Sequence, residues 1–257
     1  MGASIHSTLD ERAGGRVARI VIDNPAKLNA LSAAAVLELT KALRALADDP
    51  KLRALVLTGA GAKAFSGGVD VAELGATTQS TARAGITRLH HCISAVRACP
   101  VPVIARVNGF CIGGALELAA ACDLRIAADH ARFGMPEVRL GIPSVIEAAL
   151  LPRLMGAGRA RWLLLTGELI DAAQALRWGL VERVVDAGAL DTEVDLALDA
   201  ILAGGAAAIR AQKRLNRAYE ELPFAEAVAL SIDEFVRAYE SGEPRRLMAD
   251  YLRRKRR

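Results

Sequence analysis

The stretch 105-ARVNGFCIGGALELAAACDLRIA-127 is the part of the chain that indicates its fold most directly. It starts and ends in short apolar runs typical of buried strands, and Gly113 and Gly114 introduce a helical segment between them. The order of strand, glycine turn, helix and strand favours parallel strand pairing. Between Asn108 and Cys122 the only charged side chain is Glu117. A lone acid in a segment fit for burial needs a chemical reason.

The same alternation of strand and helix extends on both sides of this stretch. We expect strands at 16–23, 52–59, 103–109 and 124–128, a further strand in 131–141, and helices at 33–47 and 80–97. From residue 144 onward we expect mainly helices, at 144–155, 159–166, 171–178, 188–203, 206–220, 224–240 and 244–254, with a short strand at 180–185. The glycines after residue 203 predict a boundary between an α/β core, 1–203, and a helical C-terminal region, 204–257.

The composition limits the class of protein. The chain has 257 residues, of which 53% are apolar and only 4% aromatic, which suits one α/β domain with a helical appendage. The four cysteines form no C-x-x-C pair, so we expect buried free thiols in a reducing, cytoplasmic compartment. We expect no membrane-spanning segment, because no apolar run reaches the roughly 18 residues that a span requires.

The basic residues are concentrated at the C-terminus. Residues 245–257 contain seven Lys and Arg against one acid, Asp250, a net charge of +6 in a chain whose total is +4. This segment is either a solvated terminus or an anion-binding surface. An RNA-binding or scaffold protein is a hypothesis from another class, but few aromatic residues and a near-neutral core argue against nucleic acid. The adjacent His90 and His91 lack a Cys or acid at ligand spacing, so we expect no metal site.

Two glycine pairs follow predicted buried strands, in FSGGVD at 65–70 and CIGGAL at 111–116. Each pair is either a simple tight turn or a place where the backbone approaches a ligand. Because Gly114 opens a helix, its first-turn N–H groups favour negative charge. Two such turns at neighbouring strand ends could direct two N–H groups at one oxygen and form an oxyanion hole.

Three carboxylates are candidates for proton transfer. Burial of Glu117 would raise its pKa toward neutrality, but it could equally be a helix-terminus acid or the ion-pair partner of Arg106 or Arg125. Glu137 follows Pro136 in an extended segment and could share acid and base duties with Glu117. For Glu147 we favour a capping box with Ser144 over a part in the chemistry.

Four segments in order resemble the enoyl-CoA hydratase/isomerase (crotonase) family: LNAL at 28–31, LVLTGAGAKAFSGGVDVAEL at 55–74, the opening stretch, and ARFGMPEVRLGIP at 131–143. The resemblance implies an α/β fold built as a spiral of ββα units with a C-terminal helical trimerisation region. It also implies a homotrimer or a dimer of trimers, a hexamer.

The resemblance further implies an enoyl-CoA hydratase of fatty acid metabolism, with the backbone N–H groups of Val69 and Gly114 as the oxyanion hole. Glu117 and Glu137 match both catalytic glutamates of the hydratases, whereas a double-bond isomerase, the alternative, often keeps only the second. No metal or redox cofactor is implied, because coenzyme A arrives as part of the acyl-CoA substrate. The implied coenzyme A contacts are Ala26, Lys27, Leu28, Asp70, Val71 and Ala72, with Tyr251 and Arg254 reaching a neighbouring subunit's coenzyme A.

The sequence departs from the family's pattern beside these residues. Val69 stands where hydratases often have Ala, and Ala72 where a lysine is often seen. After LGIP at 140–143 the chain continues with SVIEAALLP instead of glycines. In relatives that segment lines the acyl side, so the resemblance leaves the acyl group and the role of Glu147 open.

Overall fold

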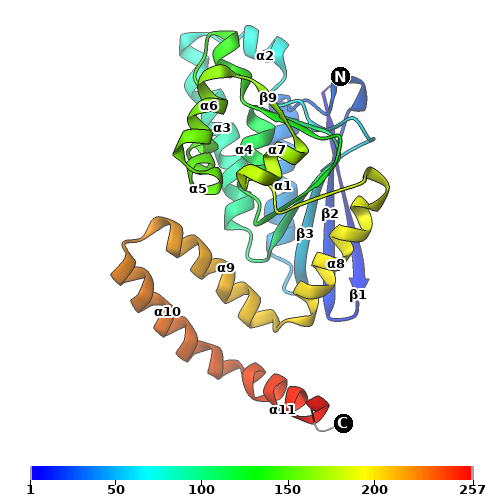
Figure 1. Ribbon diagram of the computed structural model, residues 1–257, viewed down its shortest axis with the longest axis vertical. Helices are drawn as coiled ribbons and strands as arrows, with labels where there is room; N and C mark the ends of the chain where they lie inside the picture. The colour runs from blue at the N-terminus through cyan, green and yellow to red at the C-terminus, as the bar shows by residue number, and fades with distance from the viewer. Residues whose placement is uncertain (1, 256–257) are drawn as a thin grey trace.

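The computed structural model describes residues 2–255, and Figure 1 shows an α/β core from which a three-helix arm leads away. The larger sheet has the strand order β1-β2-β3-β5-β7-β10, in which β1 and β2 pair antiparallel and the other neighbours pair parallel. Its strands are β1 (Ser4–Arg12), β2 (Gly15–Asp23), β3 (Leu52–Gly59), β5 (Val103–Val107), β7 (Leu124–Ala128) and β10 (Arg183–Val185).

A second sheet of short strands lies beside the first and has the order β4-β6-β8-β9. These strands are β4 (Ala64–Ser66), β6 (Phe110–Ile112), β8 (Arg132–Gly134) and β9 (Leu169–Asp171). The successive pairs β3 and β4, β5 and β6, and β7 and β8 each give one strand to each sheet. Helix α3 (Gln79–Ala98) follows the first pair and α4 (Gly114–Ala120) follows the second. The repeated unit is therefore ββα, as expected for a crotonase-type spiral.

The remaining core helices are mostly short. They are η1 (Pro25–Lys27), α1 (Ala33–Ala47), α2 (Val71–Gly75), η2 (Pro136–Leu140), η3 (Ile146–Leu150), α5 (Leu151–Met155), α6 (Ala157–Thr166), α7 (Ala172–Trp178), η4 (Ala187–Ala189) and α8 (Leu190–Ala203). Ser32 caps α1 by accepting a hydrogen bond from Ala35 N at 3.2 Å.

Most predicted elements are present within a few residues of their expected ends, but four strands are not predicted by the sequence. The strands β4, β6 and β9 have three residues each, too few for a hydrophobic period to emerge. The first strand, β1, is exposed along most of its length and carries no apolar alternation. It pairs with β2 at the edge of the sheet, so its place depends on backbone hydrogen bonds.

Apolar side chains fill both faces of the larger sheet. The main core lies between the sheet and helices that include α1, α3 and α4, and all four cysteines are buried as expected. A smaller core lies on the opposite face, where α8 covers the sheet with Leu190, Val194, Leu198 and Leu202. Burial on both faces explains why these parallel strands read as continuous apolar runs.

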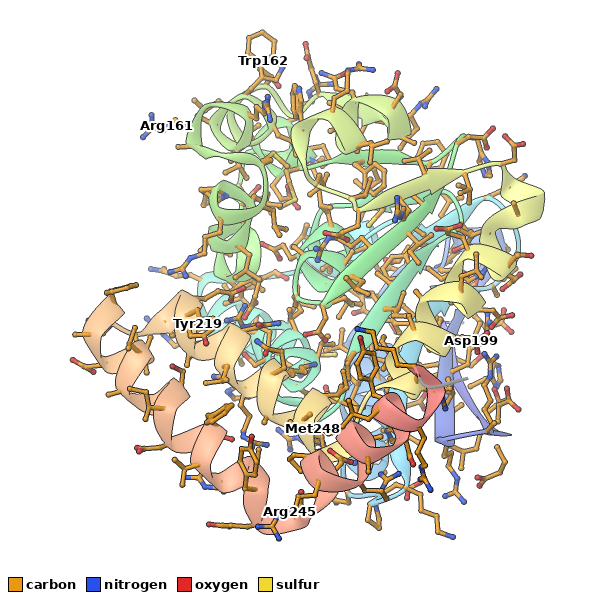
Figure 2. The ribbon with its side chains drawn as sticks, turned by 60° about the horizontal axis from the view of Figure 1, so that its bottom comes forward. Arg161, Trp162, Asp199, Tyr219, Arg245 and Met248 are labelled. Atoms are coloured by element: carbon orange, nitrogen blue, oxygen red, sulfur yellow. The ribbon has the colours of Figure 1, made fainter. Side chains whose placement is uncertain are left out.

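The arm consists of α9 (Ala206–Glu221), α10 (Phe224–Ala238) and α11 (Glu243–Lys255), with η5 (Tyr239–Ser241) before α11. Lys213 on α9 ties it to the core, because its buried Nζ donates to Asp123 Oδ2 at 2.7 Å and to Val101 O at 2.9 Å. Glu243 of α11 accepts from Ala208 N of α9 at 3.2 Å. Figure 2 shows Tyr219 on α9 and Arg245 and Met248 on α11.

The arm exposes large apolar side chains, among them Phe224, which is 86% exposed, and Phe235. Helix α8 ends and α9 begins on either side of Gly204 and Gly205, close to the predicted boundary. The division of the chain into two regions stays a prediction. Arg256 and Arg257 of the basic terminus lie outside the described residues. Across residues 2–255 no helix has the length and apolar character needed to cross a membrane.

Candidate active site

The two glycine turns meet at the ends of the paired strands β4 and β6. A Cβ placed on Gly68 would lie 3.7 Å from Gly114 N, and one placed on Gly114 would lie 3.3 Å from Val69 Cγ2. Gly68 has φ +91°, a conformation that favours glycine, and an added Cβ would come within 2.5 Å of Ile112 O. A side chain at Gly68 would therefore collide with the backbone of the second turn.

The backbone N–H groups of Val69 and Gly114 are both left unused by the secondary structure of the described residues. Gly114 is the first residue of α4, so its N–H has no partner within the helix. Val69 forms a parallel bridge with Leu31, but the two hydrogen bonds of that bridge run from Leu31 N to Gly68 O and from Asp70 N to Leu31 O. Two adjacent, unused amides are what an oxyanion hole requires.

Two buried asparagines, Asn29 and Asn108, hydrogen-bond to the loop that leads into the first glycine pair, and the sequence analysis predicts neither. Asn108 Nδ2 donates to Gly59 O at 2.9 Å and to Ala64 O at 3.1 Å. Asn29, which has φ +55°, donates to the same Ala64 O at 2.8 Å. The only available signal was an amide side chain in an otherwise apolar setting, because buried amides are normally hydrogen-bonded.

Glu117 lies in the first turn of α4 and is only 4% exposed. Burial, reinforced by the negative charges of Glu137 and Glu147, raises its pKa to about 8, against a hydrogen bond from Ala148 N that lowers it. That hydrogen bond reaches Glu117 Oε1 at 3.0 Å. A carboxyl with a pKa near 8 suits proton transfer near neutral pH.

The structure rules out the ion pairs considered for Glu117 in the sequence. Arg125 instead pairs with Glu182, and Arg106 lies 2.8 Å from Asp191. Both arginines thus have other carboxylate partners, and Glu117 has no cation to lower its pKa among those that the structure describes.

Glu137 lies half-buried in η2, on the other side of the second glycine turn. Its Oε2 accepts a hydrogen bond from Ser144 Oγ at 2.9 Å. A Cβ placed on Gly113, which has φ +57°, would overlap Glu137 Oε1. Glu117 and Glu137 therefore both lie at the Gly113–Gly114 turn, although they are twenty residues apart in the chain.

The capping box predicted for Ser144 and Glu147 is wrong. Ser144 donates to Glu137, and Glu147 Oε1 lies 2.7 Å from His90 Nδ1 of α3. The box fails because the chain is extended at Val145 and left-handed at Ile146, where φ is +43°, so no helix begins at Ser144. Nothing in the sequence around His90 indicates this contact, because it joins residues 57 positions apart.

The segments expected to contact coenzyme A lie side by side. Gly67 N donates to Leu28 O at 2.7 Å, which joins the loop at Ala26–Leu28 to the first glycine turn. Lys27 Nζ lies 3.5 Å from Asp70 Oδ2, and Asp70 caps α2 by accepting from Ala72 N at 2.9 Å. Val71, the first residue of α2, is exposed.

Tyr251 and Arg254 are not part of this cluster within one chain. Both lie on α11 at the far end of the arm, and Figure 1 shows α2 and α11 at opposite ends of the molecule. Tyr251 is 59% exposed, and Lys255 Nζ lies 5.5 Å from the centre of its ring. Residues 2–255 contain no group of three His, Cys, Asp or Glu side chains able to hold a metal ion.

Comparison with known proteins gives consistent matches. A model of the family described as enoyl-CoA hydratase/isomerase matches residues 12–256. The chain is 36% identical over 241 residues to a crotonyl-CoA hydratase of Syntrophomonas wolfei, covering 93% of each chain. It is 42% identical over 208 residues to a protein named probable enoyl-CoA hydratase in Mycobacterium bovis, covering 80% of this chain and 79% of the relative. The crystal structure of an enoyl-CoA hydratase from Bacillus anthracis matches with a TM-score of 0.84 at 32% identity, covering 89% of each chain.

Proposed function

Because the chain belongs to the enoyl-CoA hydratase/isomerase family, we propose that it is a hydro-lyase that adds water in the syn sense to a trans-2-enoyl-CoA. The product is a 3-hydroxyacyl-CoA. The observation that carries this proposal is the pair of carboxylates at one glycine turn, Glu117 and Glu137, since each can serve one of the two proton transfers.

In the proposed mechanism the thioester oxygen lies between the N–H groups of Val69 and Gly114. Negative charge develops on that oxygen as water attacks the β-carbon, and losing one such donor typically costs about 3–4 kcal/mol of barrier stabilisation. Val69 supplies a main-chain group, so its side chain does not affect the number of donors. The Val69 side chain adds bulk beside the thioester.

The two carboxylates divide the proton transfers between them. Ionised Glu117 takes a proton from the attacking water as the oxygen bonds to the β-carbon, and Glu137 gives a proton to the α-carbon. The hydroxyl and the hydrogen are then both on the substrate. The cycle closes when the proton on Glu117 is lost and Glu137 is protonated again. No metal or redox cofactor enters these steps, and coenzyme A is part of the substrate.

We also propose that the active enzyme is a homotrimer or a dimer of trimers. The exposed apolar side chains of the arm suit burial between copies of this chain. Tyr251 and Arg254, remote from the site of their own chain, then contact the coenzyme A bound by a neighbour, and the guanidinium group suits a phosphate. A cytoplasmic location stays a prediction, and we do not expect nucleic acid as a partner.

A direct assay tests the proposed reaction. Purified protein mixed with crotonyl-CoA should remove the absorbance of the conjugated enoyl thioester. Glu117→Gln and Glu137→Gln should each abolish most of the turnover, while Glu38→Gln, a matched change at an exposed position of α1, should leave it intact. Wild-type turnover in both active-site variants would overturn the assignment. Conversion of a 3-enoyl-CoA without any hydration product would select the isomerase instead.

A further inference from the structure

Glu147 is a third buried carboxylate beside the proposed site, and the hydration mechanism does not use it. Its side chain is 7% exposed. Oε1 lies 2.7 Å from His90 Nδ1 and 3.4 Å from Ser94 Oγ, both on α3. Oε2 is also buried, yet it has no hydrogen-bond partner among residues 2–255. A buried carboxylate oxygen without a donor is unfavourable, so this atom needs an explanation.

The position of Glu147 relates it directly to the reacting groups. The N–H of the next residue, Ala148, donates to Glu117 Oε1 at 3.0 Å. On the α3 side, Leu89 precedes His90 and places its Cδ2 3.1 Å from a Cβ built on Gly114. Both elements that hold Glu147 therefore also border the first turn of α4, where the thioester is proposed to bind.

The backbone directly before Glu147 is strained. Ile146 has φ +43°, a left-handed conformation that a β-branched residue rarely adopts. The preceding Val145 is extended, so the strained residue turns the chain into η3 just before Glu147. Such outliers persist where the surrounding structure imposes them, and they cluster at functional sites. Glu147 and Ala148, whose N–H donates to Glu117, directly follow this residue.

We propose that Glu147, held by His90, is a subsite for a hydrogen-bond donor on the acyl chain of the substrate, and that this donor is a hydroxyl group. The proposal rests on the proposed function, because the acyl thioester is the ligand. His90 engages Oε1 and leaves Oε2 for the substrate. Sites built to bond a hydroxyl discriminate strongly against analogues that lack it, because the buried protein group is then left unpaired.

The experiment compares pairs of substrates that differ chiefly in hydrogen-bond donation, and the ratio within each pair is compared between wild type and variants. Hex-2-enoyl-CoA thioesters carry a hydroxyl group or a fluorine atom at the fourth, fifth or sixth carbon, and kcat/KM is measured for each. Fluorine is similar in size but cannot donate a hydrogen bond. In the wild type we expect the hydroxyl compound to be preferred by about tenfold or more at one of these positions. An amino series at the same carbons shows whether a cation serves equally well, which would contradict a hydroxyl subsite.

Variants assign the preference to the named residues. Glu147→Leu should bring the ratio of hydroxyl to fluoro substrate close to one, while the exposed Glu38→Leu should keep the wild-type ratio. Because the readout is a ratio, it does not depend on how far Glu147→Leu alters turnover as a whole. If Glu147→Leu does not fold, His90→Leu at the half-exposed partner should reduce the same ratio.

The results distinguish failure of the Glu147 subsite from failure of the proposed hydration. Equal kcat/KM within every hydroxyl and fluoro pair, or a preference that survives Glu147→Leu, overturns the subsite while hydration stands. If no thioester is hydrated, the proposed function fails. The subsite is then tested separately, by calorimetric binding of the corresponding saturated hydroxy- and fluoroacyl-CoA. Equal affinities for the hydroxy- and fluoroacyl-CoA would overturn the hydroxyl subsite.

Discussion

Replacing Glu117 by glutamine should stabilise the protein at alkaline pH while removing its proposed chemistry. The pKa of this carboxyl is about 8 in the folded protein, chiefly because of burial, against 4.5 for an ordinary glutamate. Between these values the unfolded chain releases a proton that the folded protein keeps. The contribution of this carboxyl to the free energy of unfolding is therefore fully present below pH 4.5 and is lost as the pH rises toward 8.

The magnitude follows from the two pKa values. One pKa unit corresponds to about 1.4 kcal/mol, so from pH 5 to pH 8 this carboxyl lowers the free energy of unfolding by about 3.5 kcal/mol. The Glu117→Gln variant has no proton to lose. Its amide oxygen can still accept the hydrogen bond from Ala148 N, so most of the local packing is retained.

Urea unfolding followed by circular dichroism at several pH values from 5 to 8 measures this effect. The free energy of unfolding of Glu117→Gln, relative to the wild type, should increase by about 3.5 kcal/mol over that range. The matched Glu38→Gln variant, at an exposed position, should show a flat difference. A difference for Glu117→Gln that stays constant to within about 0.5 kcal/mol across the range would refute a buried carboxyl with a raised pKa.

Three further outcomes are expected. If Glu117 is the base, kcat/KM for crotonyl-CoA should rise about tenfold per pH unit and level off near pH 8, and a flat profile would exclude that role. Gly113→Ala, which adds a Cβ at φ +57° over Glu137 Oε1, should reduce kcat/KM by about a hundredfold with an unchanged circular dichroism spectrum, whereas Gly158→Ala, in open space, should leave both unchanged. Lys213→Met should lower the free energy of unfolding by about 1–3 kcal/mol, because it removes a buried ammonium group that donates to the partly buried Asp123 carboxylate and to Val101 O, and a loss below about 0.5 kcal/mol in urea titration would contradict that role.

The sequence predicts the larger elements because each carries its own signal. The parallel strands are buried on both faces and appear as continuous apolar runs, while Ser32 and the glycines mark helix ends. Glu117 could be identified as unusual because a single acid in an apolar helix is visible without any tertiary information. The sequence could not show that its hydrogen-bond partner is the backbone N–H of Ala148 and not an arginine.

The rest of the site depends on contacts between distant segments. Glu147 contacts His90, 57 residues earlier in the chain, and the preceding Ile146 is left-handed, which nothing in the residue types predicts. Asn29 and Asn108 donate hydrogen bonds to backbone carbonyls of a loop that is distant in sequence and becomes a neighbour only in the folded protein. Local propensity therefore predicts the scaffold, whereas the side chains that orient the site are set by tertiary structure.

The division of each strand pair between two sheets has a consequence for how this scaffold can diversify. The chain segments bearing Val69 and Gly114 emerge from β4 and β6, which pair in parallel, so the separation of the two segments is inherited from the spacing of hydrogen-bonded strands, about 4.8 Å. That spacing is set by main-chain hydrogen bonds between β4 and β6 and not by their side chains. Substitutions of side chains near the turns can therefore change the surface that contacts the acyl chain, while the distance between the Val69 and Gly114 segments stays constant.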